Sequence, residues 1–173
     1  MNVQTLITNS LRHAVVEVFF TMLSGEVEPG QVTVEQGSPE TNDGVVSFIG
    51  LAGAWTGTGS ITCSPVAACR IASHLLMAEY ASVNEDVLDA VAELTNMIIG
   101  NVKTDLERHL GSLGLSIPTV VFGRNFRSKS GGAEWIVQPF HWEGEQLLIR
   151  LALAKVQKPS GATTPRANAC VEL

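Results

Sequence analysis

Four residues in the middle of the chain are spaced so that a helix would gather them on one face. Asp89, Glu93, Asn96 and Gly100 follow one another at steps of four, three and four residues. Such steps stack side chains on a helix surface, so Glu93 and Asn96 are expected to project side by side. A carboxylate accepts hydrogen bonds and binds cations, whereas an amide both donates and accepts. On spacing alone, polar residues on the outward face of a helix are expected only to face solvent, and a small polar recognition site is the alternative.

Asn96 and Gly100 are poor choices for the interior of a helix. Asn is a mediocre helix former, and Gly costs about 1 kcal/mol relative to Ala at such a position. Their presence indicates a requirement other than helix stability. A glycine beside a carboxylate and an amide leaves room for the backbone of another molecule, so Gly100 is a candidate partner-binding residue. The competing interpretation is that Gly100 allows close packing against a neighbouring helix.

A long amphipathic helix is expected to carry these residues. Ser82 and Glu85 have the spacing of a capping box at its start, and Gly111 is a natural stop at its end. At about 1.5 Å per residue, this helix would be about 40 Å long. The face opposite the polar residues is a continuous apolar stripe of Val87, Val91, Leu94, Ile98, Val102 and Leu106, reinforced by Leu88, Thr95, Ile99 and Leu110.

Strand-like segments are expected on both sides of the helices in the sequence. A helix is predicted over residues 3–23, and another from Ser64, an N-cap with Pro65 at the first helical position, to about Tyr80. The fold class is therefore α+β, with helices, including the long one, packed on a largely antiparallel sheet. The predicted strands are a short one at 32–34, a hairpin of 45–54 and 55–64 that turns near 55–57, and runs at 116–123, 133–140 and 145–156.

Length and composition limit the kind of protein. At 173 residues the chain is expected to form one domain over 1–156, with a mobile C-terminal tail over 157–173. A net charge of −6 argues against nucleic acid or an anionic membrane as a partner. No apolar run approaches the roughly 20 residues of a membrane helix, and polar residues interrupt the N-terminal segment, so no export signal is expected. Three cysteines, an odd number without a CxxC pair, favour the reducing cytoplasm. The four histidines are isolated and form no cluster with cysteines, so no metal site is predicted.

Two motifs are considered as signs of phosphate chemistry, and both are rejected. Cys63 and Arg70 are separated by one residue too many for the loop of a cysteine phosphatase, so a buried structural cysteine is favoured. Gly53, Gly57 and Gly59 lack the lysine of a phosphate-binding loop and precede a strand, which is typical of turn and bulge glycines.

The segment 89–101, together with Pro118, resembles the signature of the CheC/CheX/FliY family of bacterial chemotaxis phosphatases. That signature is an aspartate or serine, then a glutamate, an asparagine and a distant proline, which Asp89, Glu93, Asn96 and Pro118 match. The order of the flanking elements is similar over most of residues 1–156. CheC-type members carry two such pairs, whereas this chain has one, so it looks like the CheX branch. Pro118 follows Asn96 by one residue fewer than expected, a departure that falls on the loop at 111–115.

The resemblance implies a protein phosphatase that hydrolyses the aspartyl phosphate of a CheY-type receiver domain. Asn96 would orient the attacking water, as a glutamine does in GTPases, and Glu93 would pair with the receiver's lysine. Asp89 would extend the acidic contact with the partner; the alternative is a solvated carboxylate in the first turn of the helix, where the helix dipole favours a negative charge. No cofactor of the chain's own is implied, because the Mg²⁺ ion belongs to the receiver domain. Lys103 and Glu107, four residues apart on the same face, are expected to be an ordinary surface pair.

Three further expectations concern partners and alternatives. Members of the CheX branch typically pair as homodimers, and the apolar edges at 120–123 or 146–154 are the candidate contacts. The first alternative function is a module that binds a receiver or flagellar protein without turnover, in which Glu93 matters and Asn96 does not. The second is a domain that binds a small molecule between helices and sheet. The basic turn over 124–132 is expected to be solvated.

Overall fold

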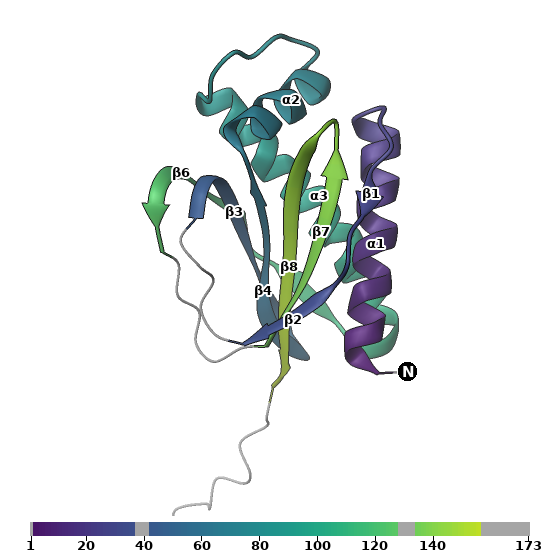
Figure 1. The fold of residues 1–173 in the computed structure, drawn as a ribbon. Helices are drawn as coiled ribbons and strands as arrows, with labels where there is room; N and C mark the ends of the chain where they lie inside the picture. Colours follow the sequence, from purple (N-terminus) through teal and green to yellow (C-terminus); the bar gives the residue numbers. More distant parts are fainter. Residues whose placement is uncertain (1, 37–41, 128–133, 157–173) are drawn as a thin grey trace, which may run out of the picture.

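A computed structural model describes residues 2–36, 42–127 and 134–156, in which three helices pack on an eight-stranded sheet (Figure 1). The α+β class is thereby confirmed. Nothing in the described ranges tests the expected domain boundary at 156, and the tail over 157–173 lies outside them. In chain order the elements are α1 (Val3–Met22), β1 (Glu28–Pro29), β2 (Thr33–Gln36), β3 (Asn42–Gly53), β4 (Trp55–Cys63), α2 (Pro65–Leu76), α3 (Glu85–Leu110), β5 (Leu113–Leu115), β6 (Thr119–Phe126), β7 (Glu134–Trp142) and β8 (Glu145–Lys155).

The sheet is antiparallel at every recorded pairing. Its strand order is β1-β7-β8-β4-β3-β5, with β2 also paired to β7 and β6 also paired to β3. The hairpins β3–β4 and β7–β8 form its centre, and β4 and β8 join them over nine residue pairs. The first hairpin turns at Ala54, one residue before the predicted 55–57, because Gly53 adopts a positive φ of 151°.

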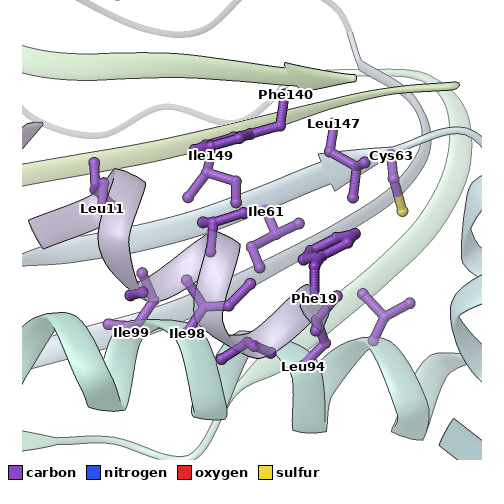
Figure 2. Close-up of a cluster of buried hydrophobic side chains, with 14 of the residues drawn as sticks. Leu11, Phe19, Ile61, Cys63, Leu94, Ile98, Ile99, Phe140, Leu147 and Ile149 are labelled. Carbon is purple, nitrogen blue, oxygen red and sulfur yellow. The ribbon is translucent and has the colours of Figure 1, made fainter. Parts of the chain in front are cut away.

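Helices α1 and α3 cover one face of the sheet, while α2 lies beyond the strand ends, at the top of Figure 1. Figure 2 shows the core between the helices and the sheet, where side chains from both layers meet. Phe19 of α1 contacts Trp142 edge-on, with ring centroids 5.3 Å apart. The buried side chains labelled in Figure 2 are Leu11, Phe19, Ile61, Cys63, Leu94, Ile98, Ile99, Phe140, Leu147 and Ile149.

Helix α2 is anchored to the β7–β8 turn. Its N-cap Ser64 accepts a hydrogen bond from the Ala67 N–H, as predicted. Arg70 donates to the carbonyl of Glu143, and His74 Nε2 lies 3.4 Å from the Glu143 carboxylate. The helix ends at Leu76 rather than near Tyr80, because the next residue, Met77, adopts a left-handed conformation with a φ of 52°.

Helix α3 spans 26 residues and confirms the expected long helix. Its N-cap is Asn84, whose side chain accepts from the Val87 N–H, so the predicted capping box of Ser82 and Glu85 is wrong. Asn is as good an N-cap as Ser, and Asn84 directly precedes the helix. Gly111, with a φ of 88°, ends α3 as predicted.

Strand pairing occurs in segments expected to be loops: β1 pairs with β7, and two further segments pair with β3. The segment after α3 forms β5 against β3, and β6 continues to Phe126, inside the predicted basic turn. In these two cases the backbone N–H and C=O groups complete a ladder on β3, which sequence pattern does not reveal. Residues 128–132 of that turn, and residue 133 of the predicted strand at 133–140, are outside the described ranges. Among the helices the structure describes, none is long and apolar enough to cross a membrane.

Candidate functional site

The four predicted site residues all lie on the outward face of α3. Asp89, Glu93 and Asn96 are exposed, and Gly100 is half-buried. Because Glu93 and Asn96 are three residues apart in a regular helix, their Cβ atoms stand about 5–6 Å from each other. The helix therefore presents a carboxylate and an amide side by side to solvent.

The orientation of this face is fixed by what lies beneath α3. All six residues of the predicted apolar stripe are buried with no measurable exposure. Ile99 packs so closely on β4 that a Cβ built on Gly59 would lie 2.9 Å from its Cδ1 atom. Because Gly59 has no side chain, Ile99 packs directly on β4 without having to shift. Rotation of the helix about its axis would expose the stripe, so Glu93 and Asn96 are held outward.

Neither Glu93 nor Asn96 has a side-chain hydrogen bond or ion pair among the residues that the structure describes. Buried Thr95, between them, donates its hydroxyl to the Val91 carbonyl and so leaves the outward face untouched. Both side chains are thus available to another molecule without breaking an internal contact. By contrast, Lys103 and Glu107 form the predicted surface pair, with Nζ and Oε2 2.9 Å apart.

Gly100 has open space where a side chain would stand. An added Cβ would have one neighbour, the Cδ1 atom of Leu115, at 4.0 Å. The interpretation that this glycine serves close packing against a neighbouring helix is therefore wrong. The space is compatible with the close approach of another molecule.

A groove that the sequence analysis missed opens beside Glu93. It has a volume of about 480 Å³ and lies where the C-terminal ends of α1 and α2 meet the first turns of α3. The sequence offered one weak signal, which was the clustering of large apolar residues at the two helix ends. The lining residues are Met22, Leu75, Leu76, Asp86, Asp89, Ala90, Glu93 and Met97.

The departure in the spacing to Pro118 falls where β5 pairs with β3. Ser116, between β5 and Pro118, ties this connection to β3, because its hydroxyl accepts the Gly50 N–H at 2.9 Å. Leu115 brings the same connection next to Gly100 of α3. Helix α3 is regular up to Leu110, so the departure in spacing lies beyond the outward face that carries Glu93 and Asn96.

The cysteines lie in an environment that opposes nucleophilic chemistry. Burial, reinforced by neighbouring Cys69 and Glu145, raises the pKa of Cys63 to about 12. A reactive cysteine needs a lowered pKa, so the structure agrees with the structural interpretation of Cys63. Arg70, its supposed partner, is engaged with the Glu143 carbonyl. Within the described ranges, no three His, Cys, Asp or Glu side chains are grouped to hold a metal ion.

Comparison with known proteins gave matches by sequence and by structure. The family model described as "Chemotaxis phosphatase CheX" matches residues 45–141. The CheY-P phosphatase CheX of Thermotoga maritima is 32% identical over 128 residues, which are 73% of this chain and 81% of that protein.

Two solved structures illustrate the structural match. A CheC-like superfamily protein from Shewanella sp. PV-4 superimposes with a TM-score of 0.77 at 28% identity, over 89% of this chain and 99% of the other. A chain of the CheX–CheY–BeF3–Mg²⁺ complex from Borrelia burgdorferi superimposes with a TM-score of 0.71, over 87% and 97% of the two chains. Its identity is 23%, so this likeness concerns the fold alone.

Proposed function

Because the chain belongs to the CheX family of chemotaxis phosphatases, we propose that it hydrolyses the aspartyl phosphate of a CheY-type receiver domain in bacterial chemotaxis signalling. A phosphatase, and hence a hydrolase, is what the family match and the named relative support. The observation that carries the proposal for the site is the unengaged pair of Glu93 and Asn96 on the outward face of a firmly packed helix.

Asn96 is the residue proposed to orient the nucleophile. The receiver brings its own Mg²⁺ and lysine, which neutralise most of the charge on the phosphoryl group. The water attacks phosphorus in line, the bond to the aspartate oxygen breaks, and the products are a free carboxylate and inorganic phosphate. Since the transition state is loose, the water needs orientation more than deprotonation, and a neutral amide supplies it.

Glu93 is proposed to fix the docking register. One turn before Asn96, its carboxylate would pair with the receiver's active-site lysine, an interaction that strengthens when the interface excludes water. Asp89, one turn further back, would extend the acidic contact. Gly100 would admit the receiver's backbone into the space where a side chain would otherwise stand.

The proposal extends to assembly and location. Strand β8, which contains residues 146–154, is paired on both sides, so it is not the edge that the sequence suggested. Strand β6, which contains 120–123, pairs with β3 alone among the described strands and exposes Val121 and Phe122. We place a homodimer contact at this edge and the reaction in the cytoplasm. A monomeric mass by light scattering would remove the dimer.

The test measures the lifetime of a phosphorylated CheY-type receiver from the same cell, with Mg²⁺ present. The wild-type protein is expected to shorten it many-fold. Asn96→Ala should lower the catalytic rate about 100-fold or more while receiver binding persists, because a preorganised polar group at the reacting atoms is lost. Asn9→Ala, an exposed asparagine of α1, is the matched control.

A receiver that binds without faster dephosphorylation would show a binding module in place of an enzyme. In that case Glu93→Ala would weaken binding and Asn96→Ala would change nothing.

A further inference from the structure

The groove beside Glu93 combines an apolar lining with acidic walls. Leu75 and Met97 pack against the core at its base, whereas Leu76 and Met22 are 48% and 46% exposed at its rim. Methionine adapts its shape to a partner surface, and exposed apolar side chains gathered at one place are typical of an interaction site.

All the charge on this groove is negative. Its lining contains the carboxylates of Asp86, Asp89 and Glu93 and no cationic side chain. The Tyr80 hydroxyl donates to Asp86 at 3.4 Å. Asp89 and Glu93 have no side-chain partner within the part of the chain that the structure describes. The groove is therefore complementary to an apolar side chain that has a basic residue beside it.

The groove is also continuous with the proposed active site. Glu93 forms part of its wall and stands one turn from Asn96 on the same face of α3. A partner that contacts both residues from outside must extend over a surface much wider than two side chains, since specific interfaces bury roughly 600 Å² or more on each side. The groove, at the adjoining ends of α1 and α2, is close enough to Glu93 to fall within an interface of that area.

We propose that this groove is a second docking point for the receiver domain, which inserts an apolar side chain flanked by a basic residue from the segment next to its phosphorylated aspartate. The inference rests on the proposed function and deepens it, because it assigns recognition of the receiver to residues outside the Glu93–Asn96 pair. Contacts in the groove set the affinity for the receiver, and Asn96 sets the rate of hydrolysis.

The test separates affinity from rate with Leu76→Gln, which removes an apolar contact without adding charge. Its matched control is Val66→Gln, at the other end of α2 and 50% exposed, outside the groove. With phosphorylated receiver as substrate, Leu76→Gln should raise KM at least tenfold and leave kcat within twofold. Val66→Gln should change neither. The wild-type KM should also rise with NaCl, and less steeply in Asp89→Asn.

The outcomes distinguish this inference from the proposed function. If the wild type is active and Leu76→Gln leaves KM unchanged, the groove is not a docking point although the phosphatase proposal stands. If no receiver is dephosphorylated, titration calorimetry measures binding of a receiver loaded with BeF3 and Mg²⁺. Weaker binding by Leu76→Gln than by the wild type would then support the groove as a docking point in a protein that binds the receiver without hydrolysis. No binding of any receiver overturns both. A changed oligomeric mass with unchanged receiver affinity would assign the groove to a second copy of the chain.

Discussion

The two halves of α3 carry similar polar residues on the same outward face, but they use them differently. In the second half, Lys103 pairs with Glu107, and the other oxygen of Glu107 accepts the Leu113 N–H at 2.8 Å. Asp105, on the side of α3 that faces α1, accepts a hydrogen bond from Ser10 of α1 at 3.1 Å. In the first half, Glu93 and Asn96 have no such partners in the described chain.

The difference comes from what stands opposite each half. The second half faces the start of α1 and the chain that turns into β5, so its polar groups join segments distant in sequence. The first half faces the open groove at the ends of α1 and α2. Polar residues of one helix can therefore stabilise the fold at one end and remain available for a partner at the other. Substitutions in the two halves should separate stability from activity.

The largest expected effect on receiver affinity comes from the first half. Glu93→Gln keeps the size of the side chain and removes its charge, so it leaves the receiver's lysine without a partner in the interface. Loss of one member of a desolvated charge pair costs about 2 kcal/mol or more, which is about 30-fold or more in Kd. Titration of the receiver with wild type and variant measures this. Equal affinities, with both proteins folded, would contradict the assigned role of Glu93.

A smaller effect on stability is expected from the second half. The Leu113 N–H and then the Lys103 ammonium hold the pKa of Glu107 below its ordinary value of 4.5. Since the pKa is lowered in the folded state, the carboxylate contributes its full stabilisation at pH values above 4.5. This contribution is lost as the pH falls through the folded-state pKa. Glu107→Gln should therefore lower the unfolding midpoint at neutral pH without changing KM or kcat.

The control for Glu107→Gln is the pH dependence itself. Denaturant melts of wild type and variant should converge as the pH drops below 4.5 toward the folded pKa. A stability difference that persists unchanged in acid would show that the charge of Glu107 is not what stabilises the end of α3.

The smallest expected effect has opposite signs for stability and function. Gly100→Ala places a methyl group in open space, so it should raise the free energy of unfolding by about 0.5–1 kcal/mol. The same methyl group should obstruct the receiver and raise KM several-fold. Denaturant melts and steady-state kinetics on one preparation check both. A stabilised variant with an unchanged KM would remove Gly100 from the proposed interface.

Several features of the fold were predictable because they depend on local pattern. The apolar period of α3 fixes which side is buried, and with it the outward face of Glu93 and Asn96. Ser64 followed by Pro65 correctly marked the start of α2. The wrong predictions concern choices between equivalent local signals, such as Asn84 over Ser82 as the N-cap of α3. They also include the early end of α2 at Met77, which no stop signal in the sequence marked.

The long helix, the spacing of its polar residues and the resemblance to chemotaxis phosphatases could be predicted, because periodicity and motif spacing are properties of neighbouring residues. The packed fold was needed to show that Gly100 faces open space, that Glu107 closes the end of α3 on β5, and that a groove adjoins Glu93. Each of these depends on segments far apart in the chain. Their meeting is set by how the helices pack on the sheet, which no local pattern encodes.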